Sequence, residues 1–179
     1  TVTNAVAIEG TAAEVTAALV TAGTKVVVDD PTVNITTTPT IGALNLIAAE
    51  TTGVVTATLA ADSLANLAAL NTASTDQITV TVNDANEAAL TAANLSTLGG
   101  KTAGTVTVTN AVAITGNHDQ VTAALVTDET KVVASTATVT LNDNAGTAVT
   151  ASELSAIGGK TSGQVTVSNA VAITGNPSE

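Results

Sequence analysis

One phrase of thirteen residues occurs twice in this chain of 179 residues, almost unchanged. Residues 105–117 read TVTVTNAVAITGN and residues 164–176 read QVTVSNAVAITGN, while residues 1–8 open the chain with TVTNAVAI from the same phrase. Near-identical copies of a short segment indicate an architecture made by stacking one small unit. The repeat therefore constrains the fold before any single side chain is considered.

Two offsets relate the copies. A shift of 59 residues carries 95–104 onto 154–163 as well as the phrase onto its second copy. A shift of 106 residues carries 15–20, VTAALV, onto the identical 121–126. The lysines occupy only two positions of the unit and are Lys25, Lys131, Lys101 and Lys160. They therefore belong to the repeat, which argues against any one of them as a unique catalytic group.

Hydrophobic spacing predicts a strand and a short helix in each unit. Residues 105–109 alternate between valine and threonine, which is typical of a strand with valine on the buried face. Val15, Ala18 and Leu19 are spaced three or four apart, as on one face of a helix. Gly99-Gly100 and Gly158-Gly159 follow such segments, where we expect left-handed helix ends.

Strands separated by a helix must run parallel, because a tight hairpin does not fit between them. We therefore predict an α/β solenoid, with a parallel β-sheet along one side and short helices or loops on the other. The expected coils are about 1–23, 24–53, 54–76, 77–104, 105–129, 130–163 and the partial 164–179. Because the chain starts and stops within the phrase, we expect a segment of a longer array, which makes the missing export signal uninformative.

Composition supports a thin, repeated core. The chain lacks Phe, Tyr, Trp, Met and Cys, yet 45% of its residues are hydrophobic and its mean hydropathy is +0.42. Val, Ile, Leu and Ala must form the core, and small uniform side chains suit repeated layers. The regular apolar spacing argues against disorder. Without cysteine there are no disulfides or thiolate metal sites, and the redox compartment stays open.

The charge excludes several partners. A net charge of −11, with four lysines and no arginine, disfavours binding to nucleic acid or to anionic membranes. No apolar run reaches the roughly 18–20 residues of a transmembrane helix. We expect self-association or contact with neighbouring repeats, because each open end exposes a strand edge, and contacts with the cell surface or extracellular matrix.

Residues 154–173 resemble leucine-rich repeats loosely, with Leu154 and Ile157 ahead of a Val-x-Val strand. A longer glycine-containing insert and Val in place of Leu depart from that pattern, so the resemblance carries geometry and no ligand. The Val-Thr-Val-Thr-Asn-Ala phrases and Ala-Ala-Leu segments resemble tandem repeats of very large bacterial proteins, cyanobacterial-type cell-surface, S-layer-like or adhesin proteins. That resemblance covers the chain and implies an extracellular, structural or adhesive role.

No catalytic constellation is visible in the sequence. The only histidine, His118, lies in the polar run 116–120, and we interpret it as a solvated loop residue. Residues 158–161, GGKT, end like a phosphate-binding loop, but Ser155 stands where the upstream glycine belongs. We therefore expect no enzyme activity.

Calcium is the one cofactor the sequence leaves open. Short Asn/Asp clusters follow two strands, and their residues are Asn83, Asp84, Asn142, Asp143 and Asn144. Oxygen-rich loops hold Ca²⁺, which takes six to eight oxygen ligands. The same residues are ordinary turn formers and helix caps, and we favour that interpretation. A calcium-dependent adhesin segment is one functional alternative.

Paired threonines give the other alternative. Thr-x-Thr pairs recur on the expected strands, including one at 1–3, and the candidate ligand residues are Thr56, Thr58, Thr79, Thr81, Thr107, Thr109, Thr138, Thr140 and Thr166. On a parallel stack they would form a flat lattice of the kind that binds ice, although threonine is also a common exposed strand residue. The sequence favours a rigid extracellular spacer, or the stalk of a surface layer or adhesin.

Overall fold

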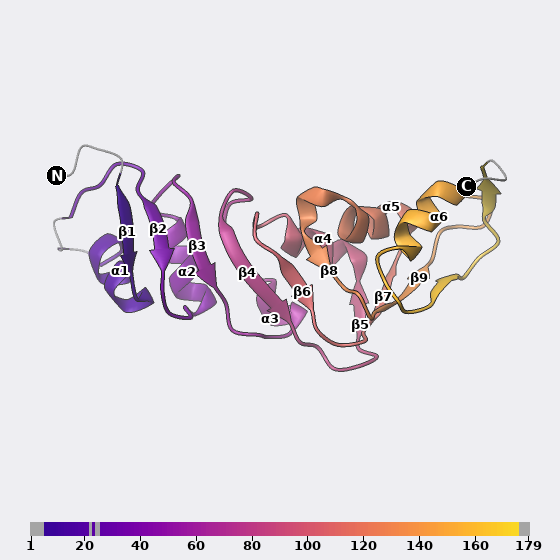
Figure 1. Ribbon diagram of the computed structural model, residues 1–179, viewed down its shortest axis with the longest axis horizontal. Coiled ribbons are helices and arrows are strands. Elements are labelled where there is room, and N and C mark those ends of the chain that lie inside the picture. Colours follow the sequence, from indigo (N-terminus) through magenta and orange to yellow (C-terminus); the bar gives the residue numbers. More distant parts are fainter. Residues whose placement is uncertain (1–5, 22, 24–25, 176–179) are drawn as a thin grey trace.

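The computed structural model describes residues 6–21, 23 and 26–175. The molecule is elongated, with β1 near one end and α6 near the other (Figure 1). The α-helices are α1 (Ala12–Leu19), α2 (Ile41–Ala48), α3 (Leu64–Leu67), α4 (Ala92–Gly99), α5 (His118–Val121) and α6 (Ala151–Gly158). A π-helical turn, η1 (Thr122–Val126), continues α5, and a 3-10 turn, η2 (Asp128–Thr130), follows it.

The strands form three sheets. The first has the order β1 (Ala7–Gly10), β2 (Thr32–Ile35), β3 (Val55–Thr58), β4 (Gln77–Val82), β6 (Val106–Val108) and β8 (Val132–Val133). The second has the order β5 (Ala89–Thr91), β7 (Ala113–Gly116), β9 (Thr138–Leu141) and β11 (Val165–Val167). The third pairs β10 (Ala148–Thr150) with β12 (Ala172–Thr174).

Every strand pair in these sheets is parallel. Partners are 21 to 26 residues apart: Thr56 lies opposite Gln77, and Val106 lies between Val80 and Val132. We call the chain between one strand and its neighbour in the same sheet a coil. Helices of adjacent coils also touch, α1 with α2, α3 with α4, α4 with α5 and α5 with α6. The prediction of an α/β protein with parallel strands is confirmed.

The expectation of one strand per coil is wrong beyond β4. There the phrase contains two strands, β6 and β7, joined by a corner at Asn110. The sequence repeat also differs from the stacking register. Val80 pairs with Val106, which pairs with Val132 on its other side. The 59-residue shift instead carries Val80 onto Val139, which is seven residues after Val132. Equivalent residues of successive repeats therefore lie on different sheets. The strands expected near 1 and 24 begin outside the described residues.

The core is one continuous aliphatic cluster, with Leu44, Ile47, Leu67, Ile78, Leu95 and Ile114 among its fully buried side chains. The predicted alternation is confirmed in the interior strands: Val55 and Ala57 of β3 are buried, and Thr56 and Thr58 are exposed. Val165 and Val167 of β11 are only half-buried, because this strand lies at the edge of its sheet.

Side-chain caps fix the starts of the helices. A threonine, serine or asparagine accepts a backbone N–H at each N-terminus, and these caps are Thr11, Thr40, Ser63, Thr91, Asn117 and Thr150. The expectation of left-handed helix ends is wrong, since Gly100 and Gly159 have φ of −69° and −68°. Gly99 is needed for a different reason: a Cβ there would lie 2.1 Å from the Thr130 carbonyl oxygen of the next coil.

None of the helices in the described part of the chain is long and apolar enough to cross a membrane.

Candidate functional site

A Thr-x-Gly motif precedes a strand in three coils, at residues 51–53, 102–104 and 161–163. Each threonine hydroxyl contacts a backbone carbonyl of the preceding coil. The pairs are Thr51 with Pro31 at 2.6 Å, Thr102 with Ile78 at 2.8 Å and Thr161 with Ala137 at 2.5 Å. Each hydroxyl oxygen also accepts the N–H of the motif glycine, at 2.8–3.0 Å. The motif is therefore a hydrogen-bonded connection between coils.

The glycine of each motif lies against that same carbonyl. A Cβ added to Gly53, Gly104 or Gly163 would lie 2.4, 2.3 or 2.2 Å from the oxygen that the threonine contacts. Side chains do not fit at such distances, so only glycine allows the backbones of two coils to approach this closely.

Thr102 is the most enclosed member of this set, with 1% of its surface exposed. Its hydroxyl oxygen accepts the backbone N–H groups of Ile78 and Gly104, each at 2.8 Å. Its single proton is shared between the carbonyls of Asp76 and Ile78, at 2.9 and 2.8 Å. Asp76, also buried, accepts the N–H of Val55 in the coil before, at 2.8 Å. Thr102 and Asp76 thus pair buried polar groups across coil boundaries.

Two aspartates cap helices that belong to preceding coils. Asp84 accepts the N–H of Leu64 at the start of α3, at 2.7 Å, and Asp143 accepts the N–H of His118 at the start of α5, at 2.9 Å. The 59-residue shift relates these two aspartates. Negative side chains at helix N-termini are favourable because the unpaired N–H groups there point outward. Both residues were calcium candidates, and both are engaged as caps.

The asparagine of the repeated phrase extends this connection to a third coil. The Asn110 side-chain amide donates to the carbonyl of Asp84, and that of Asn169 donates to the carbonyl of Asp143, each at 2.7 Å. Each aspartate therefore contacts a helix in the coil before it and an asparagine in the coil after it. We call these contacts the Asp–Asn ladder.

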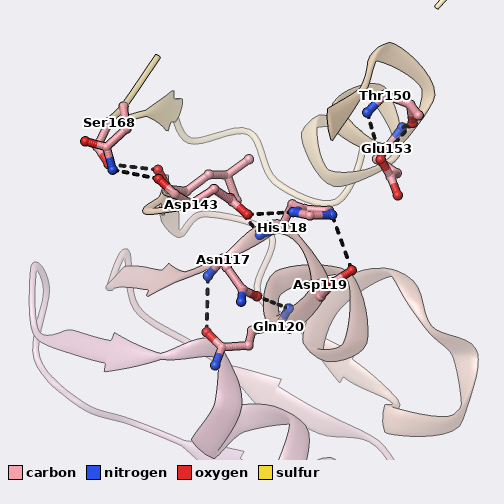
Figure 2. Close-up of polar contacts among 10 residues, drawn as sticks. Asn117, His118, Asp119, Gln120, Asp143, Thr150, Glu153 and Ser168 are labelled. Atoms are coloured by element: carbon pink, nitrogen blue, oxygen red, sulfur yellow. Dashed lines mark hydrogen bonds and ion pairs between the residues drawn. The ribbon is translucent and has the colours of Figure 1, made fainter. Parts of the chain in front are cut away.

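The interpretation of His118 as a solvated loop residue is wrong. It is the first residue of α5, and only 14% of its side chain is exposed. Its Nδ1 lies 2.6 Å from Asp143 Oδ1, and its Nε2 lies 3.3 Å from the exposed Asp119 (Figure 2). The neighbouring coil brings Asp143 over the ring, a placement that local sequence does not reveal.

The electrostatics of this pair follow from its contacts. The hydrogen bond to Asp143 raises the pKa of His118 above its ordinary value, against desolvation, which lowers it. The charges of Asp119, Asp143 and Glu153 also raise the pKa of His118. A carboxylate can orient a histidine as a general base, but in the described part of the chain this ring contacts only the carboxylates of Asp143 and Asp119 and no hydroxyl nucleophile. The pair connects two coils.

The five calcium candidates form two groups that lie in different coils. Asn142, Asp143 and Asn144 line a shallow polar pocket of about 240 Å³ with the segment from Asn117 to Gln120. Asn83 and Asp84 lie at the corner after β4, in an earlier coil. Within the described residues there is no group of three or more His, Cys, Asp or Glu side chains placed to hold a metal ion.

The threonine candidates divide between two sheets. In the first sheet Thr58 lies opposite Thr79 and Thr81 opposite Thr107, but Thr56 faces Gln77 and Thr107 faces Val133. Thr109 lies beyond β6, where its hydroxyl donates to the Val82 carbonyl at 3.2 Å. The candidate threonines therefore do not form one continuous lattice across the repeat copies.

In the second sheet Thr140 lies opposite Thr166 on one side and Thr115 on the other, and Thr115 lies opposite Thr91. Thr138 lies opposite Ala113. This single row of four threonines includes two residues that the sequence did not single out. Ice binding stays a prediction that rests on this row.

The sequence carried one overlooked signal for the contacts between coils. Thr102-Ala-Gly104 and Thr161-Ser-Gly163 share the 59-residue shift, and Thr51-Thr-Gly53 has the same pattern ahead of an earlier strand. The pairing of Asp143 with His118 has no such signal, since residue 59, the equivalent of His118, is Leu59.

No protein-family model, curated protein or solved structure matches this chain.

Replacing Thr102 with valine removes the hydroxyl but keeps the shape of the side chain. Two buried N–H groups lose their acceptor, so we expect a loss of about 1–3 kcal/mol in the free energy of unfolding. Thr161→Val is the matched control in the half-buried equivalent position and should cost less. Urea unfolding followed by circular dichroism measures both, and equal losses would contradict this role of Thr102.

His118 should make stability depend on pH in one direction. Because its folded pKa is raised, its stabilisation is present below the unfolded pKa of about 6.5 and is lost as pH rises through the folded pKa. The urea concentration at the midpoint of unfolding should decrease as the pH is raised from 6 to 9. His118→Asn should make this decrease smaller. The lone histidine also gives one unambiguous NMR titration, and a pKa below about 6.5 would refute the assignment.

Proposed function

We propose that this chain is a segment of an α/β solenoid and serves as a rigid extracellular spacer, in the stalk of a surface layer or adhesin. The observation that carries the proposal is the recurrence of the same contacts at several coil boundaries. The Thr-x-Gly motif and the Asp–Asn ladder both join residues that are 20 to 26 positions apart. These groups are used to hold coils together.

Stacking of this kind produces length more readily than it produces a binding cavity. Each coil contacts its neighbours, so added coils extend the molecule along one axis without enlarging a central core. The elongated outline in Figure 1, from β1 to α6, fits that use. The polar groups that chemistry would require, His118 and Asp143 among them, are instead committed to helix capping and contacts between coils.

The surface suits a crowded position outside the cell. Threonines occupy the exposed face of the interior strands, and the net charge is −11. A net charge of this size keeps neighbouring molecules solvated and separate. The absence of cysteine and of aromatic residues leaves few side chains that oxidise readily.

The rod can be tested by lengthening it. A chain with a second copy of residues 105–163 inserted after Gly163 adds two coils, and strands are spaced about 4.8 Å apart. Small-angle X-ray scattering should therefore show a maximum dimension larger by about 10 Å with an unchanged cross-section. Thr102→Val tests local stability without changing length and is the control for altered folding. Growth of the cross-section instead of the length would contradict the spacer.

The location requires a separate measurement on cells that produce the protein. Antibodies raised against the folded chain should label intact cells, and external protease should remove the signal without lysis. Labelling that depends on permeabilisation would place the protein inside and refute the extracellular role, while leaving the rod geometry intact.

A further inference from the structure

Two of the four lysines in this acidic chain line one pocket. The pocket has a volume of about 210 Å³ and lies between Lys131, directly before β8, and Lys160, two residues after α6. Leu125 and Val132 form part of its apolar wall. The chain has fifteen acidic residues and no arginine, so cationic side chains are scarce and their concentration at one place needs an explanation.

The related boundary between earlier coils has no such unpaired charge. The 59-residue shift relates Lys160 to Lys101, which is half-buried and whose Nζ donates to two carbonyls of the coil before, at 2.9 and 2.5 Å. The same shift relates Lys131 to Thr72, whose hydroxyl donates to the Lys101 carbonyl at 2.6 Å. One lysine and one threonine thus close the earlier boundary through hydrogen bonds.

At the later boundary a lysine stands in place of that threonine, and neither ammonium group has a partner. Lys131 and Lys160 are exposed, and in the described part of the chain neither side chain forms a hydrogen bond or an ion pair. The Thr105 hydroxyl lines the same pocket and also forms no hydrogen bond with a described residue. Two like charges at one pocket repel each other, and an anion between them relieves that repulsion.

The backbone at Lys131 has a conformation that lysine rarely adopts. Its φ is +51°, in the left-handed region where glycine and asparagine are usual. Its carbonyl accepts the N–H of Val106 at 3.0 Å, so the pairing of β8 with β6 holds the residue in place. A glycine would adopt this conformation without strain. A lysine is therefore expected here only if its side chain has a use of its own.

We propose that this pocket binds a tetrahedral oxyanion, sulfate or phosphate, as the free ion or as a group on a larger molecule. Lys131 and Lys160 supply the positive charge, and the Thr105 hydroxyl donates a hydrogen bond. The pocket has room for such an ion with part of its hydration, because one water occupies about 30 Å³ of the liquid. Distant acidic residues oppose binding little, since salt at about 0.15 M screens exposed charges beyond about 8 Å.

Four variants test the pocket. Amide NMR titration with sodium sulfate or sodium phosphate, at an ionic strength held constant with sodium chloride, should give saturable shifts with a Kd of about 1–10 mM. Lys160→Gln and Lys131→Gly should each weaken binding about tenfold, because each removes a charged donor. Lys101→Gln removes the same charge at the related position and should leave the affinity unchanged. Asp128→Asn should tighten binding, because Asp128 is the one acidic residue among the described residues that line the pocket.

Lys131→Gly also separates binding from folding. Glycine accepts the left-handed φ, so the urea midpoint of this variant should equal or exceed that of the unmodified chain. A lower midpoint would show that Lys131 is kept for structure and would overturn its role in binding.

Dextran sulfate and uncharged dextran distinguish the two sources of the oxyanion. If the group belongs to a larger molecule, dextran sulfate should bind more tightly than free sulfate at equal sulfate concentration, and Lys160→Gln should weaken it. If the free ion is the ligand, sulfate or phosphate should shift the pocket residues and dextran sulfate should not. The absence of saturable binding in both arms, or equal losses in Lys101→Gln and Lys160→Gln, overturns the proposal. The inference goes beyond the spacer role, because a rod without this site would still be a spacer.

Discussion

The distance between coils depends on a contact at one backbone carbonyl per Thr-x-Gly motif. In the motif at 102–104, the Ile78 carbonyl receives the threonine hydroxyl and leaves no room for a side chain on Gly104. The hydrogen bond draws the coils together, and glycine removes the atom that would keep them apart. The strands that follow can then form parallel ladders at the usual spacing of about 4.8 Å. At the three boundaries that carry the motif, this close approach brings the apolar faces of neighbouring coils together.

The composition of the core follows from that spacing. A layer one strand deep is filled by one to three aliphatic side chains per strand, such as Val106 and Val108 in β6. An aromatic ring would extend beyond such a layer into the next coil and force the backbones apart. The chain therefore reaches close packing with Val, Ile, Leu and Ala alone. Three of its buried polar residues, Asp76, Thr102 and Asp143, are paired across coil boundaries.

Periodicity was sufficient to predict the parallel α/β fold and the valine-in, threonine-out alternation. It was insufficient for the lateral arrangement, because the 59-residue repeat and the stacking register differ by seven residues. Thr81 and its equivalent Thr140 therefore lie on different sheets, and the expected single lattice of threonines is divided. The contact of His118 with Asp143 escaped prediction for a related reason, since it joins residues 25 apart that only the register brings together.

The repeated phrase shows where the stability of such a chain resides. Full burial of an isoleucine side chain stabilises the folded state by about 1.5–3 kcal/mol. Ile114 is fully buried, whereas Ile173, in the same local sequence, is 60% exposed and contributes much less. A coil is thus stabilised mainly by its neighbours and only slightly by its own residues. The same local sequence therefore becomes a fully buried core layer only where a neighbouring coil covers it, as at Ile114.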